Sequence, residues 1–450
     1  DYMTLHRVAL ASLLVFSHTT SAQIVNTDTL VKQVGQLQRT TQQVESRLGQ
    51  SISAPPFSLS TLPPISELVT EPLAKLPKFL PIGPDLSNPI LVDVEVEDGF
   101  RAVENQWIVL ADPHSKQVLI RLGANIESSQ YYAGLGLTLL RFTVPVLLNT
   151  KQALAKHLPT DTFATLDRNH IYQVQSRQSL SIDRHTLPDI KLNNSHMCET
   201  LLRIGMIDSA IDKTHRAFSK ANIKVKSFLA NNLSSPSLHG SAVASVLIGN
   251  TDALTPLLPK AVLYSAEVFY RQSEFTQGAT LSAMIEALNW MLEQDVEVIN
   301  MSLAGPDNRI LERVINAATD KGAFIVAAAG NEGPAAAAVY PAGYDNVIAV
   351  SAFDRLHQPY RWSNRGDYID YSALGVNVLS AQPRQGLGKE SGTSMAAPVV
   401  SAALVCLLAE HKKHNKLNRV TVLTNLSDRA IDLGPKGRDP IFGRGGIERN

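Results

Sequence analysis

The chain has 450 residues, of which 44% are hydrophobic, and this content is ample for more than one packed domain. Its 41 basic and 41 acidic residues give a formal net charge of zero, and no stripe of lysine or arginine stands out. Disorder throughout is therefore excluded, and neither nucleic acid nor an anionic membrane surface is expected as a partner.

The first residues have the order of features of an export signal. His6 and Arg7 precede the apolar run "VALASLLVF", and the small residues Thr20 and Ala22 suit cleavage. The run is too short to span a bilayer, and a short buried helix is the alternative interpretation. We therefore expect residues 1–22 to be a signal peptide, no transmembrane segment in the mature protein, and a periplasmic or extracellular location.

Two segments of different character follow the predicted signal. In residues 23–54, Leu30, Val34 and Leu37 begin an apolar stripe with steps of four and three, which predicts a short amphipathic helix. That helix either packs on its own chain or contacts a partner. Residues 55–92 contain nine of the 24 prolines, and this content predicts an extended linker.

Residues 93–176 predict a small α+β domain. The runs "QWIVLAD", "LGLTLLRFTVP" and "TFATLDRNHIYQVQ" predict strands, and "SKQVLIRLG" and "NTKQALAKHLP" predict helices, the second capped by Asn149. This order suits a sandwich of the split βαβ kind, and it contains no candidate catalytic cluster. The polar residues 177–195 that follow predict an exposed connector that proteases can reach.

Residues 196–450 alternate short apolar strands with amphipathic helices. Strands are predicted at "LLRIGMID", "KAVLYSAEVF", "VEVINMSL", "AFIVAAA" and "NVIAVSAF", and helices at "LSAMIEALNWMLEQ" and "NRILERVINAATDK". This pattern predicts an α/β fold with a doubly wound parallel sheet flanked by helices on both faces. Ligands of such sheets bind at the carboxyl ends of the strands.

Polar residues stand at those strand ends and at one helix start. Asp208 ends "IGMID", His239 opens "HGSAVASVLIG", Asn331 follows "IVAAAG", and Ser394 precedes the apolar helix predicted from Met395. Each residue alone could be a cap, a turn residue or a buried polar group. Together they supply a hydroxyl nucleophile, its general base, an acid that orients the base, and an oxyanion donor.

The helix after Ser394 and the cysteines carry two further expectations. Pro398 has no N–H to donate to the carbonyl of Ser394, so the first turn of the helix is expected to be irregular. Cys198 and Cys406 are the only cysteines, and they form either a disulfide, which export permits, or buried thiols. Spacing excludes a nucleophile elbow, a Ser-x-x-Lys site and the common metal motifs.

The segments "GMIDSAID", "HGSAVASVLIG", "NMSLAGP", "AAAGNEGP" and "SGTSMAAP" occur in the order typical of the subtilisin-like serine peptidases, which the chain resembles from about residue 195 onward. The resemblance implies a catalytic triad of Asp208, His239 and Ser394, with Asn331 in the oxyanion hole. It also implies that the substrate backbone pairs with the strand Ser302, Leu303, Ala304 and Gly305. Glu332 is expected near the pocket for the residue before the scissile bond.

The resemblance also gives the small domain a role. It implies a ferredoxin-like propeptide that assists folding and blocks the cleft, with cleavage between about Ser176 and His196. The expected protein is thus a secreted serine endopeptidase made as a proenzyme, which acts on proteins or peptides. No cofactor is expected, although structural calcium is frequent in the family. An inactive relative that serves as a binding module and an esterase with the same triad are the alternatives.

Overall fold

The computed structural model describes residues 76–174, 195–230, 233–274, 276–413 and 418–449. All of them belong to one compact unit, Thr70–Asn450. The predicted signal peptide at 1–22, the predicted helix at 23–54 and nearly all of the predicted connector at 177–195 lie outside the described residues.

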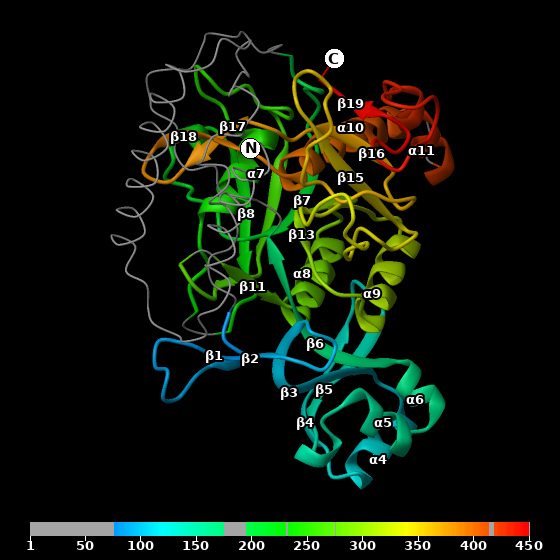
Figure 1. Cartoon of the computed structure of the whole chain (residues 1–450). Helices are drawn as coiled ribbons and strands as arrows, with labels where there is room; N and C mark the ends of the chain where they lie inside the picture. Colours follow the sequence, from blue (N-terminus) through cyan, green and yellow to red (C-terminus); the bar gives the residue numbers. More distant parts are fainter. Residues whose placement is uncertain (1–75, 175–194, 231–232, 275, 414–417, 450) are drawn as a thin grey trace, which may run out of the picture. The chain divides into compact units, whose positions relative to one another are not determined.

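The carboxyl-terminal part is built on an eight-stranded sheet in which every neighbouring pair is parallel, with the order β19-β16-β15-β14-β12-β7-β9-β8 (Figure 1). The predicted parallel sheet is confirmed. Its strands are β7 (Arg203–Asp208), β8 (Asn222–Ser227), β9 (Val262–Glu267), β12 (Val298–Met301), β14 (Phe324–Ala328), β15 (Val347–Phe353), β16 (Tyr371–Leu374) and β19 (Gly446–Ile447).

Helices cover both faces of this sheet. One apolar core joins the sheet to α7 (Leu238–Ile248), α10 (Thr393–Lys413) and α11 (Arg419–Asp428). A second core joins it to α8 (Leu281–Glu293) and α9 (Arg309–Asp320). Side chains alternate between the faces, so Met206 lies in the first core and Ile207 in the second.

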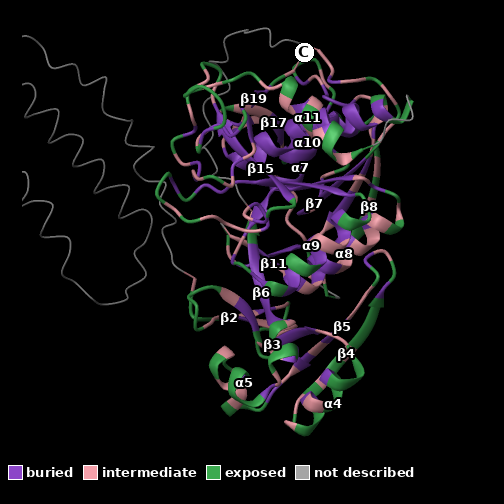
Figure 2. Cartoon of the chain, turned by 90° about the vertical axis from the view of Figure 1, so that its right-hand side faces the viewer, coloured by how far each residue is buried: buried purple, intermediate pink, exposed green. Residues whose placement is uncertain are grey.

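The apolar composition of α10 reflects its central position. The helix is long and apolar enough to cross a membrane, but 89% of its most apolar window is buried inside the structure. Figure 2 shows α7 and α10 as almost continuously buried. Within the described residues, α10 is therefore a core helix of the sheet domain.

The amino-terminal part has the βαββαβ order of the ferredoxin-like fold that the resemblance implies. It comprises β3 (Arg101–Leu110), α4 (Pro113–Arg121), β4 (Asn125–Tyr132), β5 (Leu137–Thr143), α5 (Lys151–His157) and β6 (Leu166–Val174). The strands are antiparallel in the spatial order β4-β5-β3-β6, which is the ferredoxin-like arrangement. Trp107 and Phe142 from the strands and Leu154 from α5 are fully buried in a common core.

Three local predictions differ from the structure. The helix cap is Thr150, whose hydroxyl accepts from the N–H of Ala153 at 3.1 Å, whereas Asn149 accepts from the indole of Trp107 at 3.0 Å. Strand β4 was not predicted because its sequence, "NIESSQYY", is largely polar. The linker predicted over 55–92 contains β1 (Phe79–Ile82) and the start of β2 (Leu91–Glu95). Pro81 fits there because β1 is an edge strand.

Backbone hydrogen bonds between strands join the two parts. Strand β6 pairs antiparallel with β11 (Gln277–Thr280) and with β13 (Leu303–Ala304), and β11 pairs in turn with β10 (Phe269–Arg271). The last strand of the amino-terminal part, β6, is therefore hydrogen-bonded to strands of the carboxyl-terminal part.

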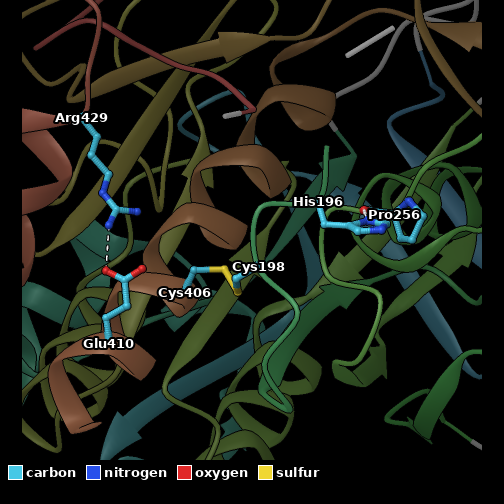
Figure 3. Close-up of a disulfide and its surroundings, with 6 residues drawn as sticks. All are labelled: His196, Cys198, Pro256, Cys406, Glu410 and Arg429. Carbon is cyan, nitrogen blue, oxygen red and sulfur yellow. Dashed lines mark hydrogen bonds and ion pairs between the residues drawn. A yellow bond between two sulfur atoms is a disulfide. The ribbon is translucent and has the colours of Figure 1, made fainter. Parts of the chain in front are cut away.

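Cys198 and Cys406 form a disulfide, with their Cα atoms 6.0 Å apart, which decides between the two predicted alternatives (Figure 3). The bond attaches the segment before β7 to the middle of α10. His196, two residues earlier, is held by a 2.8 Å hydrogen bond between its Nδ1 and the carbonyl of Pro256. The start of the carboxyl-terminal part is thus fixed at two neighbouring points.

Candidate active site

Asp208 and His239 meet at the carboxyl end of the central sheet. Asp208 is the last residue of β7, and His239 is the second residue of α7. Nδ1 of His239 lies 2.7 Å from Oδ1 of Asp208, and both side chains are buried. Because a carboxylate oxygen can only accept, Nδ1 carries the proton, and Nε2 of the neutral ring is left as the basic atom.

The start of α7 is held against the loop that follows β7. The N–H of Gly240 donates to the hydroxyl of Ser209 at 2.8 Å. A Cβ at position 240 would lie 2.2 Å from the carbonyl oxygen of Ser209, so only glycine permits this approach. The segment "HGSAVASVLIG" contains this glycine, but nothing in the sequence indicates Ser209 as its partner.

Ser394 lies at the start of α10, as predicted, and is fully buried. Its Oγ and Nε2 of His239 are both buried atoms without a hydrogen-bond partner among the residues that the structure describes. The predicted bond between nucleophile and base is therefore not formed here. Such contacts are commonly long before substrate binds, so the arrangement still suits a serine–histidine pair.

The carbonyl of Ser394 has an unusual partner. Pro398 lies inside α10 and has no N–H to give, and the hydroxyl of Ser302 donates to the Ser394 oxygen at 2.9 Å instead. Ser302 in turn accepts from the amide of Asn300 at 2.9 Å, and Asn300 accepts from Ser401 at 3.1 Å. The irregularity expected at Pro398 is thus compensated by side chains, and α10 is continuous.

Asn331 follows β14 and is anchored beside the nucleophile. Its Oδ1 accepts from the backbone N–H of Thr393 at 3.0 Å and from the Thr393 hydroxyl at 3.1 Å. The turn before it needs glycine, because Gly330 has φ of +111° and a Cβ there would meet the Asn364 side chain at 2.6 Å. The amide of Asn331 is thereby oriented relative to Ser394.

The predicted substrate strand is only partly a strand. Leu303 and Ala304 form β13, which pairs with β6. Ser302 is buried beneath Ser394, and Gly305 exchanges backbone hydrogen bonds of 2.9 and 3.0 Å with Tyr340. Glu332 is exposed next to Asn331, with its N–H bonded to the Asn364 side chain at 2.9 Å.

A second carboxyl group acts on His239. Burial lowers the pKa of His239, but the charge and hydrogen bond of Asp208, together with the charge of Glu390, outweigh it and raise the net pKa above 6.5. Burial also raises the pKa of Glu390 itself, and the Gln382 hydrogen bond and the His239 charge offset this only in part. Glu390 was not predicted as a site residue, because nothing in the local sequence indicates its proximity to His239.

Across the described ranges, no group of three or more His, Cys, Asp or Glu side chains is arranged to hold a metal ion.

Comparison with known proteins places these features in a family context. The profile described as "Subtilase family" matches residues 201–445. The chain is 31% identical over 220 residues to "Subtilisin" of Bacillus pumilus, covering 47% of this chain and 78% of that protein. It is 30% identical over 250 residues to "Minor extracellular protease Epr" of Bacillus subtilis (strain 168), covering 55% of this chain but only 38% of that protein.

Among solved structures, the prenylagaramide maturation protease PagA aligns with 25% identity and a TM-score of 0.48, covering 55% of this chain and 90% of that one.

Proposed function

Since the chain belongs to the subtilase family of serine peptidases, we propose that it is an endopeptidase that hydrolyses peptide bonds through Ser394, His239 and Asp208. One observation carries the proposal. The 2.7 Å contact between Asp208 and His239 leaves Nε2 as the base, and Nε2 and Ser394 Oγ are both buried with no partner in the described part of the chain. A substrate carbonyl group that binds here would therefore meet a hydroxyl and a base that are not engaged with other groups of the described chain.

The geometry supports a sequence of steps. Ser394 Oγ attacks the scissile carbonyl carbon and its proton passes to His239 Nε2, while Asp208 holds the ring and stabilises the imidazolium. The oxyanion is bound by the Asn331 side-chain amide and the N–H of Ser394. His239 then gives the proton to the leaving amine. Water hydrolyses the acyl-enzyme by the same route in reverse.

A fluorophosphonate probe tests the assignment of the nucleophile. We expect the mature protein to be labelled on Ser394 and Ser394→Ala to take no label. Labelling that survives the substitution would contradict the proposal. Cleavage of esters without cleavage of any denatured protein would favour an esterase, and the absence of both activities and of labelling would favour a binding module.

We also propose that residues 93–176 are an inhibitory propeptide. Strand β6 lies between two strands of the peptidase part, so that Gln173 is opposite Gly278 on β11 and opposite Ala304 on β13. An extended substrate would bind by adding a strand at β13. Because β6 already pairs there, a protein substrate and the amino-terminal part would compete for the same strand.

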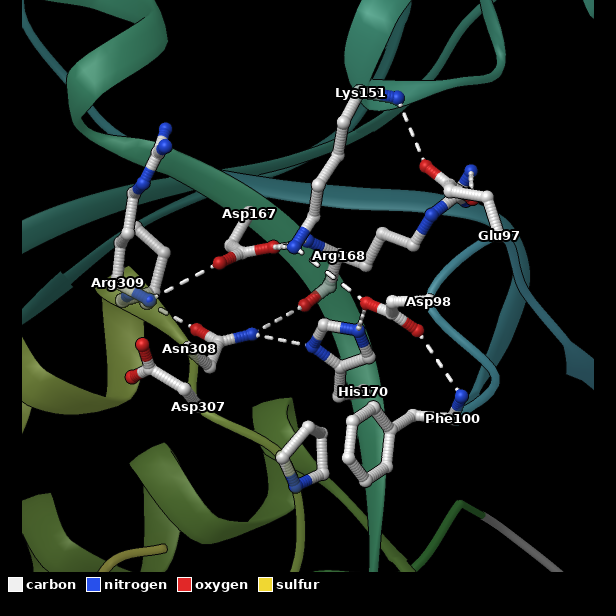
Figure 4. Close-up of polar contacts among 12 residues, drawn as sticks. Glu97, Asp98, Phe100, Lys151, Asp167, Arg168, His170, Asp307, Asn308 and Arg309 are labelled. Atoms are coloured by element: carbon white, nitrogen blue, oxygen red, sulfur yellow. Dashed lines mark hydrogen bonds and ion pairs between the residues drawn. The ribbon is translucent and has the colours of Figure 1, made fainter. Parts of the chain in front are cut away.

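Polar contacts at two helix starts support the same proposal. Asp167 accepts from the N–H of Arg309 at 3.1 Å at the start of α9 (Figure 4). Asn169 accepts from the N–H of Ser282 at 3.0 Å at the start of α8. The first N–H groups of a helix have no partner within the helix and carry its positive dipole end. These contacts therefore favour a tight complex between the two parts.

We further propose that the protein is exported and then cleaved between about Ser176 and His196. The Cys198–Cys406 disulfide supports export, because such bonds persist outside the reducing cytosol. Mass spectrometry of the protein collected from the periplasm or the medium tests both points. We expect a new amino terminus within this interval, and recovery of the protein only from the cytosol would contradict export.

A further inference from the structure

A further buried polar group, Glu390, comes shortly before the nucleophile in the chain. Glu390 is the last residue of β18 (Gly386–Glu390), just before the turn into α10, and is only 5% exposed. Its Oε1 accepts from the amide of Gln382 at 2.8 Å. Its Oε2 is buried without a partner in the described part of the chain, as are His239 Nε2 and Ser394 Oγ.

The local structure fixes Glu390 in place. Strand β18 forms a hairpin with β17 (Val378–Gln382). A Cβ at Gly388 would lie 2.8 Å from Cγ of Gln382, so the absence of a side chain there lets Gln382 extend along the hairpin toward Glu390. The hairpin is tied to the helix of His239, because the N–H of Ala381 donates to the hydroxyl of Ser245 at 2.9 Å.

Burial of Oε2, which has no partner among the described residues, destabilises the charged form of Glu390. A buried carboxylate is destabilised unless both oxygens are paired, and its pKa rises as a result. The His239 charge lowers that pKa only in part. A cationic group that arrived with the substrate would supply the missing partner and would form a charge-assisted hydrogen bond.

The side of the site that Glu390 occupies follows from the attachment of its hairpin to the helix of His239. The acyl part of the substrate is proposed to pair with β13. His239 must deliver its proton to the leaving amine, so the residue that carries this amine lies next to Nε2. Because the hairpin that ends at Glu390 is tied to the helix that carries His239, we place Glu390 on the leaving-group side as well.

We propose that Glu390 selects a lysine or arginine side chain in the residue that directly follows the scissile bond. This specificity rests on the peptidase function proposed above. The carboxylate would pair with the ammonium or guanidinium group through Oε2, while Gln382 keeps Oε1 in position.

Quenched fluorescent peptides that differ only in the residue after the scissile bond test the proposal on the wild-type protein. The series contains arginine, its neutral isostere citrulline, lysine, norleucine and glutamate. We expect kcat/KM for arginine to exceed that for citrulline roughly 10- to 100-fold, which is the range for a charge-assisted hydrogen bond in a buried site. Equal rates for arginine and citrulline would overturn the assignment of Glu390.

Two substitutions of Glu390 test the same proposal with the same peptides. In Glu390→Gln the ratio of arginine to citrulline should fall to about one, and in Glu390→Lys glutamate should become the better substrate. Glu410→Gln, which changes an exposed carboxylate in the last part of α10, should keep the wild-type ratio. A ratio that survives Glu390→Gln would also overturn the proposal. Absence of probe labelling and of all peptide cleavage by the wild type would instead contradict the peptidase function.

Discussion

The hydroxyl of Ser302 donates to the carbonyl oxygen of Ser394 at 2.9 Å, in place of the N–H that Pro398 lacks. The nucleophile is therefore supported from β12 and β13 as well as from its own helix. Ser302→Ala leaves that buried carbonyl unsatisfied. We expect a loss of about 1–3 kcal/mol in the free energy of unfolding, together with a lower kcat, measured by urea unfolding and peptide hydrolysis.

Ser265 gives a matched control for this substitution. It is also fully buried, but its hydroxyl has no partner in the described chain, so Ser265→Ala should change stability much less. Pro398→Ala restores an N–H that can reach the Ser394 carbonyl, and it should recover part of the loss in the Ser302→Ala background. Additive losses in the double variant would contradict this explanation.

The raised pKa of His239 predicts the acid limb of the pH profile. The ring must be neutral to accept the Ser394 proton, so kcat/KM should fall as the pH drops through a value above the ordinary 6.5. Glu390→Gln removes one of the charges that raise this pKa, and the acid limb should move to lower pH. The profile is measured with the norleucine peptide, whose uncharged side chain keeps substrate titration out of the comparison. An acid limb that stays in place or moves upward would contradict the coupling.

Asn331→Leu should lower kcat with little change in KM, because the oxyanion exists only in the transition state. Removal of one such donor costs about 2.7–4 kcal/mol of transition-state stabilisation, a magnitude known from subtilisin itself, and it corresponds to about 10²- to 10³-fold in kcat. Steady-state kinetics separate the two constants. A change confined to KM would assign Asn331 to substrate binding instead.

Weaker contacts between the proposed propeptide and the peptidase part should shorten the time that the precursor needs to become active. Asn169→Ala removes two contacts to Ser282 at the start of α8, one of 3.0 Å to its N–H and one of 3.1 Å to its hydroxyl. We expect the full-length variant to reach full activity after a shorter lag than the wild type. Ser129→Ala, at an exposed position on β4, is the control and should keep the wild-type lag.

Reduction of the disulfide should destabilise the protein substantially. The bond closes a loop with a sequence separation of 208 residues, for which the chain-entropy relation gives about 5 kcal/mol. Thermal unfolding with and without a thiol reductant measures the loss. A variant with alanine at positions 198 and 406 should have the lower melting temperature and no further response to the reductant.

The sequence was informative where a residue and its role lie close together in the chain. Asp208 at a strand end and His239 at a helix start were placed correctly because an apolar run marks each element. Polar β4 was missed because its pattern gives no strand signal. The roles of Ser302 and Glu390 depend on contacts between elements distant in sequence, and no local pattern indicates these. The roles proposed for the triad and for Asn331 remain predictions that the experiments above test.

Maturation of the proposed precursor would create a new chain end just ahead of Cys198. That end would be anchored by a covalent bond to the helix that begins at the nucleophile. Chain termini open easily, and disorder and proteolytic cleavage concentrate there. The anchored terminus would therefore give the mature enzyme a defence against self-digestion that lasts as long as its surroundings stay oxidising.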